Sequence, residues 1–205
     1  MIPNLSSVYW AVAIVVFSAL LALTLRYFRN RRQRTPLVTQ ATIVSLRARI
    51  DKLRERAGDR KVIPKLLDNS SYLVTKAATA LDFEQMVRAR LHANLAAMAL
   101  VWAETVLDDN GFKADTPHLR TTTRLTMGLE YIKLMKLNAA AEEFEFVWTD
   151  EHAHVDAKRL SVMAKVWMFA TKGDHQEAAE HEMLLLMLPR ISQMDGVEME
   201  YGLDK

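Results

Sequence analysis

The feature that most constrains this chain is an uncharged apolar run near its N-terminus. Residues 8–25 carry no charged side chain, and their only polar side chains are those of Tyr9, Ser18 and Thr24. As an α-helix these eighteen residues rise about 27 Å, close to the thickness of the hydrocarbon core of a bilayer. We therefore expect residues 8–28 to form a transmembrane helix, preceded by a short external segment, residues 1–7.

The flanking residues predict the orientation of this helix. Tyr9 and Trp10 lie near one end and Tyr27 and Phe28 near the other, as expected for aromatic residues at two membrane interfaces. Five arginines follow the apolar run and face anionic lipid headgroups in this interpretation: Arg26, Arg29, Arg31, Arg32 and Arg34. The positive-inside bias then places the rest of the chain in the cytoplasm. A bacterial inner membrane is favoured, with an organelle membrane as the alternative.

Two other interpretations of the apolar run are weaker. A cleaved signal peptide carries its positive charges before the apolar run and a small-x-small cleavage site after it, whereas here the charges follow and no such site does. A buried core helix conflicts with five arginines within nine residues of its end. The transmembrane interpretation is therefore preferred.

Charge divides the remainder into a basic neck and an acidic body. Residues 26–65 hold thirteen Lys/Arg and three Asp/Glu, a net charge of +10, whereas the rest of the chain has a net charge of −8. We expect a neck at 29–65, a body at 66–192 and a flexible tail at 193–205. The chain has no cysteine, which excludes disulfides, thiolate zinc sites and a cysteine nucleophile.

The neck contains one amphipathic helical pattern. Its apolar residues are spaced 3-4-3-4 and end before Gly58: Ile43, Leu46, Ile50, Leu53 and Ala57. This seam either packs on the body or pairs with a second copy of the chain as a homo-oligomer. Nucleic acid is not the expected partner, because beyond Phe28 no aromatic residues are interleaved with the basic ones of the neck.

The body is expected to be all-α, because its apolar residues follow helical rather than alternating spacing. We predict helices over 81–107, 117–136 and 138–148. A fourth begins at a cap formed by Thr149 and Asp150 and reaches Thr171. The last runs to Pro189 from a capping box of Asp174 and Glu177.

Two stretches of the body resemble the tetratricopeptide repeat, over about residues 120–189. The first carries small and aromatic residues at the spacings of that family: Gly128, Tyr131, Ala140, Phe144 and Val147. The second lies thirty-eight residues further on: Val166, Phe169, Ala178, Glu182 and Leu185. It departs from the pattern at Val166, where the family prefers Gly, and at Glu182, which replaces an aromatic. Residues 66–107 do not match, and an ordinary helical bundle is the alternative.

The resemblance implies stacked antiparallel helical hairpins whose first helices line a concave groove. Four residues on those helices are our candidates for the groove: Arg124, Met127, Lys165 and Met168. The Met-rich stretch at 183–188 offers either an adaptable docking surface or core.

Catalytic chemistry has little support in the sequence. No phosphate loop, dinucleotide fingerprint or nucleophile motif is present, so we expect neither an enzyme nor a cofactor. Weak candidates for a metal site are Glu151 with His154, in Glu-x-x-His spacing, and Glu177 with His181.

These observations predict a membrane-anchored protein–protein interaction or assembly module that presents a cytoplasmic helical domain. Its partners would be other proteins or subunits of a membrane complex. The alternative is a constitutive structural subunit of such a complex, and a metal-binding helical-bundle enzyme is less favoured.

Overall fold

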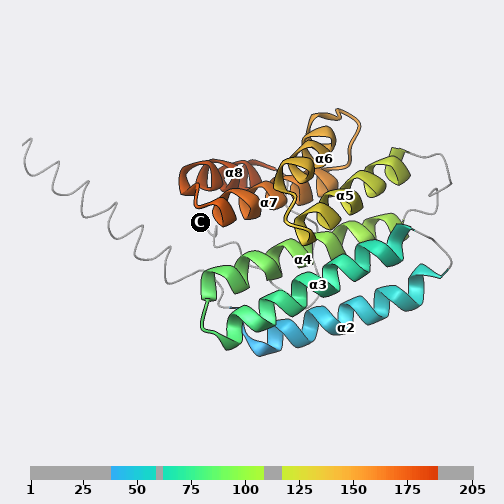
Figure 1. Cartoon of the computed structure of the whole chain (residues 1–205). Helices are drawn as coiled ribbons and strands as arrows, with labels where there is room; N and C mark the ends of the chain where they lie inside the picture. Colours follow the sequence, from blue (N-terminus) through green and yellow to red (C-terminus); the bar gives the residue numbers. More distant parts are fainter. Residues whose placement is uncertain (1–37, 59–61, 109–116, 189–205) are drawn as a thin grey trace, which may run out of the picture. The chain divides into compact units, whose positions relative to one another are not determined.

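The structure, a computed structural model, describes residues 38–58, 62–108 and 117–188. Within these ranges the chain forms seven α-helices and no strand, which confirms the predicted all-α class. The helices are numbered from α2 as in Figure 1: α2 Gln40–Ala57, α3 Val62–Asp82, α4 Met86–Asp108, α5 Pro117–Lys133, α6 Leu137–Thr149, α7 Val155–Lys172 and α8 His175–Met187.

None of the helices in the described ranges is both long and apolar enough to cross a bilayer. The predicted transmembrane helix at 8–28 lies outside the described residues, together with its five arginines. The external segment 1–7 and the tail 193–205 lie outside them too.

The helix predicted for the neck is α2, and it packs on α3 and α4. It begins with a capping box in which the side chain of Thr39 accepts from the backbone of Thr42 and the side chain of Thr42 accepts from Thr39 N–H. All five residues of the apolar seam are buried. The seam is therefore covered by the chain itself and is not free to pair with a second copy. The helical body begins with α2, well before residue 66.

The sequence predicted one helix over 81–107, but the structure has a turn between α3 and α4. Glu84 adopts a left-handed conformation with φ of 57°. Gln85 N–H donates to the Ala80 carbonyl at 2.8 Å, and Glu84 N–H donates to Leu81 at 3.0 Å. This pair of bonds is the Schellman arrangement that ends a helix, usually with glycine at the left-handed position. With glutamate there, the apolar pattern runs through the turn without a recognisable stop.

The same turn recurs in the two later hairpins. Met135 (φ 57°) joins α5 to α6, with a bond from Lys136 N–H to Tyr131, and Gly173 (φ 83°) joins α7 to α8. Each turn is followed, five residues after its left-handed residue, by a buried alanine on the second helix: Ala89, Ala140 and Ala178. Three hairpins therefore share one local design, which makes the fold helical-repeat-like.

The α5–α6 hairpin closes around a glycine. A Cβ atom built on Gly128 would lie 2.7 Å from Cζ of Phe144, whose side chain is completely buried. The small residue of the first helix thus makes room for the aromatic ring of the second. Helix α7 begins at Val155, later than the predicted cap at Thr149 and Asp150.

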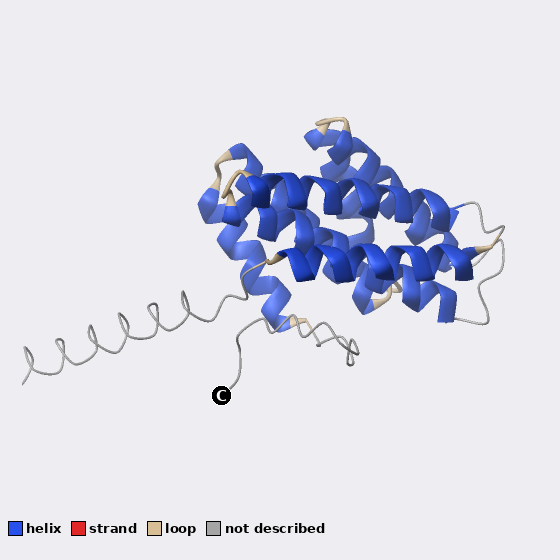
Figure 2. Cartoon of the chain, turned by 90° about the horizontal axis from the view of Figure 1, so that it is seen from below, coloured by secondary structure: helices blue, strands red, loops and turns tan. Residues whose placement is uncertain are grey.

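The two later hairpins, α5–α6 and α7–α8, each pack on the α3–α4 hairpin through their first helix. Helix α5 packs on α3, α7 packs on α4, and α6 lies against both α5 and α7. Figure 1 shows α2, α3 and α4 side by side, with α5 to α8 above α4 in this view and α8 beside α7. In Figure 2 the described part of the chain is helix and loop throughout. The faces of α5 and α7 that meet α3 and α4 form the main core, in which Trp102 is fully buried.

The close packing at Gly128 makes a direct prediction. Alanine at this position gains about 1 kcal/mol of helix propensity, but its methyl group overlaps Phe144 in a core where overpacking costs about 1–3 kcal/mol. We expect Gly128→Ala to lower the free energy of unfolding, measured by circular dichroism in denaturant. In a Phe144→Leu background, Gly128→Ala should leave the free energy of unfolding unchanged or raise it. An equal loss in both backgrounds would contradict the packing argument.

Candidate functional site

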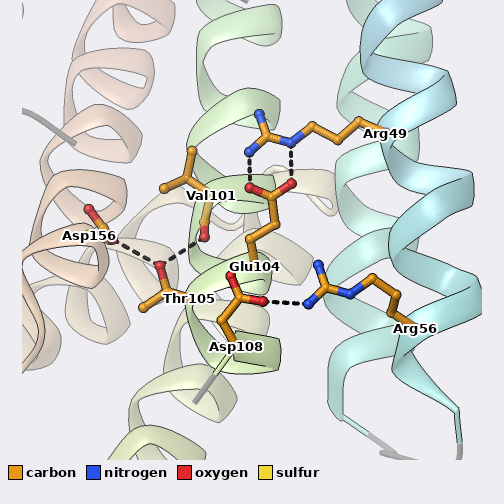
Figure 3. A network of polar contacts seen from close by, with 7 residues as sticks. All are labelled: Arg49, Arg56, Val101, Glu104, Thr105, Asp108 and Asp156. Atoms are coloured by element: carbon orange, nitrogen blue, oxygen red, sulfur yellow. Dashed lines mark hydrogen bonds and ion pairs between the residues drawn. The ribbon is translucent and has the colours of Figure 1, made fainter. Parts of the chain in front are cut away.

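Polar contacts on α4 link α2, the first described helix, to α7 in the last hairpin (Figure 3). On one side, Arg49 of α2 forms a two-bond ion pair with Glu104 of α4, and Arg56 pairs with Asp108. On the other side, the Thr105 hydroxyl lies 2.9 Å from Oδ2 of Asp156 on α7 and 3.1 Å from the Val101 carbonyl. Its single proton can serve either acceptor. Helix α4 therefore connects α2 with α7.

These contacts explain part of the charge asymmetry. Arg54 of α2 also pairs with Asp68 of α3, at 2.9 Å. Three basic residues of the predicted neck thus neutralise acids of the body. The Arg49–Glu104 pair is the most sheltered, with side chains 14% and 32% exposed. Because partial burial strengthens charge-assisted bonds, this pair is expected to contribute more to the docking of α2 than the exposed pairs do.

A second cluster surrounds the start of α7. His154 caps the helix, because its Nδ1 accepts from Asp156 N–H at 3.2 Å. The imidazole also lies 3.5 Å from the Asp156 carboxylate, and its ring is 6.0 Å from that of Trp102. Trp102 donates through Nε1 to the Thr122 hydroxyl at 3.1 Å. The cluster fixes the N-terminus of α7 against α4 and α5, which is a structural role.

The metal candidates are not assembled into a site. Glu151 and His154 lie in the loop before α7, not on one helix face as their spacing suggested. Glu177 and His181 are both on α8, where His181 contacts the carbonyl of Glu177 and the ring of Phe169. Among the residues that the structure describes, no group of three His, Asp or Glu side chains is arranged to hold a metal ion.

The four groove candidates have different environments. Lys165 is buried and pairs with Glu145 of α6, and Met168 is in the core. Arg124 is partly exposed, donates to Glu143 at 2.9 Å and stacks over the Phe146 ring, and Met127 is also partly exposed. Because α3 and α4 cover the inner faces of α5 and α7, these four residues do not line one open groove.

Exposed apolar residues form several surface groups. The sequence leaves one of them, in the Met-rich stretch at 183–188, open between docking surface and core, and it does not identify the others. On α8, Met183 and Met187 are 57% and 75% exposed, and three leucines beside them are only half-buried: Leu184, Leu186 and Leu188. We call these five residues the α8 strip. The turn between α3 and α4 exposes Phe83, Met86 and Val87, and that between α5 and α6 exposes Leu134 and Met135. The first of these groups was hidden within the predicted helix 81–107.

His92 of α4 lies in an environment that disfavours its charged form. Burial against α7 lowers its pKa from the ordinary 6.5, the charges of Lys76 and Arg88 lower it further, and a hydrogen bond to the Arg88 carbonyl opposes them. Its ring meets that of Trp167 edge-on at 5.5 Å. The neutral imidazole is thus part of the α4–α7 interface.

Comparison with known proteins gives no relatives. No protein-family model matches the chain, and no curated protein or solved structure is significantly similar to it.

A double-mutant cycle tests the docking of α2. We expect a coupling free energy of about 1–3 kcal/mol for Arg49→Ala with Glu104→Ala, because the pair is bidentate and sheltered. The matched cycle of Arg54→Ala with Asp68→Ala, an exposed pair, should give less than about 1 kcal/mol. Denaturant unfolding measures both. Equal coupling in the two cycles would contradict the assignment of Arg49–Glu104 as the principal link.

The pKa of His92 predicts the sign of an acid effect. In the folded protein the imidazole stays neutral at a pH where the unfolded chain, with a pKa of 6.5, already binds a proton. The free energy of unfolding therefore falls as the pH is lowered from above 6.5 through the folded pKa. Denaturant melts at several pH values should show a smaller fall in His92→Gln, whereas the exposed His175→Gln should behave like the original chain. An unchanged pH dependence in His92→Gln would exclude this histidine as a source.

Proposed function

We propose that this chain is a membrane-anchored protein–protein interaction or assembly module. Residues 8–28 would hold it in the bilayer, and the helices after residue 38 would form a cytoplasmic domain of tetratricopeptide-like hairpins. The composition and flanking charges of the N-terminal run support the anchor. The recurring turn and the glycine–phenylalanine contact at Gly128 support the relationship of the hairpins to that repeat. No catalytic role is proposed.

The α8 strip is the observation that carries the interaction role. Helix α8 buries only Ala178 and Leu185, so it packs on α7 with one side while its outer side is not covered by any other helix of the described residues. In a helical-hairpin stack such a terminal helix is normally covered by a polar cap or by another element. On α8 the exposed side carries Met183 and Met187, whose flexible side chains adapt to different apolar partners.

The partner that fits this surface is an amphipathic helix of another protein. It would add to the stack as α8 adds to α7, with its apolar side on Met183 and Met187. The first half of α8 exposes Glu180 and His175 among other polar side chains, so a helix with basic residues at one end would match it. The inner faces of α5 and α7 are less suitable, because α3 and α4 already pack there.

Charge placed on the α8 strip should abolish binding without unfolding the domain. We expect the full chain with Met183→Glu and Met187→Glu to lose its crosslinked partner in native membranes, when a photoreactive residue replaces Leu184. The matched control is Val44→Glu, which alters a similarly exposed apolar residue on α2 and should retain the crosslink. Circular dichroism melts should be unchanged in both. Persistence of the crosslink in the α8 variant would refute this surface.

A constitutive subunit of a larger complex is the second candidate, favoured by apolar exposure at several separate places. Besides the α8 strip, Val44 on α2 and Leu134 and Met135 at the α5–α6 turn are exposed. In a subunit enclosed by partner proteins, all of these exposed apolar residues would be covered. The full chain purified in detergent distinguishes the two roles: a monodisperse, cooperatively unfolding monomer indicates the module, and aggregation that only co-expressed partners relieve indicates the subunit.

A further inference from the structure

The turn between α3 and α4 carries a group of exposed apolar residues that has no role in the folded core. Phe83 and Val87 are 72% and 67% exposed, and Met86 is 39% exposed. We call these three residues the apolar tip. We propose that the apolar tip enters the interfacial layer of the same bilayer that holds the N-terminal anchor. This inference rests on the anchor in the proposed function and adds a second membrane contact.

The apolar tip is held outward by a defined backbone. The left-handed Glu84 and the bonds from Glu84 N–H and Gln85 N–H to α3 fix the turn, and Phe83 N–H still donates to the Thr79 carbonyl at 3.2 Å. Phe83 therefore directly follows the last turn of α3, and its backbone is still bonded to that helix. In water this phenylalanine side chain lacks the stabilisation that burial of its apolar surface would give, so transfer into an apolar environment is favourable.

The position of the tip points to the bilayer. Gln40 at the start of α2 donates through Nε2 to Oδ1 of Asp82 at 3.2 Å, which ties the turn to the end of the domain where the N-terminal segment joins it. Four peptide units separate Arg34, the last of the basic run, from Val38, the first described residue. Fully extended, they span at most about 14 Å. If the proposed anchor holds Arg34 at the headgroups, the length of the chain keeps Val38 within that distance of them.

The charges beside the apolar tip indicate that it contacts the bilayer through its apolar side chains and not through electrostatic attraction. Arg88 and Arg90 follow the turn, Asp82 ends α3 and Glu84 lies in the turn, so these two basic and two acidic residues balance in charge. The adjoining arginines at 26–34 supply the attraction to anionic lipid. The tip itself then contributes through its apolar side chains, as a phenylalanine and aliphatic residues do at a membrane interface.

A second contact would restrain the domain. A single tether of a few residues lets the domain rotate freely about it, whereas a tether and a tip on the same bilayer leave rotation only about the line that joins them and about the bilayer normal. The α8 strip would then sample fewer directions relative to the bilayer, which favours a partner in the same membrane.

The absence of cysteine from the chain allows a direct test. In the full-length protein, single cysteines at Gln85 and at Lys136 would carry an environment-sensitive fluorophore. These residues occupy equivalent positions in the α3–α4 and α5–α6 turns, and both turns expose apolar side chains, so Lys136→Cys is a matched control. A third label at Phe17→Cys reports on the anchor. The protein is reconstituted in phosphatidylcholine and phosphatidylglycerol vesicles containing spin-labelled lipids.

Lipids labelled near the headgroup should quench the fluorophore at position 85 severalfold more than that at position 136. Adding Phe83→Ser and Val87→Ser should reduce quenching at position 85 to the level at 136, and deep spin labels should quench position 17. Quenching at 17 with equal, weak quenching at 85 and 136 overturns the tip and leaves the anchor standing. A blue shift at 85 without lipid quenching indicates a protein contact and also overturns the tip. Without quenching at 17, the anchor of the proposed function fails, whatever position 85 shows.

Discussion

The packing around α4 is the interaction on which the rest of the domain depends. Six buried alanines of this helix let its neighbours approach closely: Ala89, Ala93, Ala96, Ala97, Ala99 and Ala103. Helices α2, α3 and α7 all pack directly on it. Its polar residues then select their registers, since Glu104 receives Arg49 from one side and Thr105 meets Asp156 from the other. Apolar packing on α4 supplies the buried surface. The directional polar contacts then determine which turn of α2 and of α7 faces which turn of α4.

Much of the local structure could be predicted, because it depends on residues close together in sequence. The seam of α2 and the Asp174 cap, whose carboxylate accepts from Glu177 N–H, follow from spacing alone. The resemblance to the tetratricopeptide repeat singled out Gly128 and Phe144, and the structure shows that they contact each other. Two boundaries could not be predicted in this way. The α3–α4 turn has glutamate where glycine is usual, and α7 is capped by a histidine at 154 instead of a residue with a short oxygen side chain.

The candidate sites were harder to predict, because they depend on contacts between distant segments. The spacing of Lys165 and Met168 places them on a first helix of a hairpin, but it does not indicate that α4 and α6 cover that helix. Likewise, Phe83 and Val87 read as ordinary members of a helical apolar pattern until the turn exposes them. The α8 strip was visible as a Met-rich stretch, although only the structure shows which of its side chains remain exposed.

The account as a whole requires α2 to be part of the folded domain, since its docking places the domain only a few residues from the basic run. Native-state hydrogen exchange of the full-length protein tests this most directly. We predict that the amides of α2 around Ile50 exchange with protection close to that of α4, because both are released by the same unfolding event. Rapid exchange throughout α2 while α3 to α8 stay protected would contradict the account.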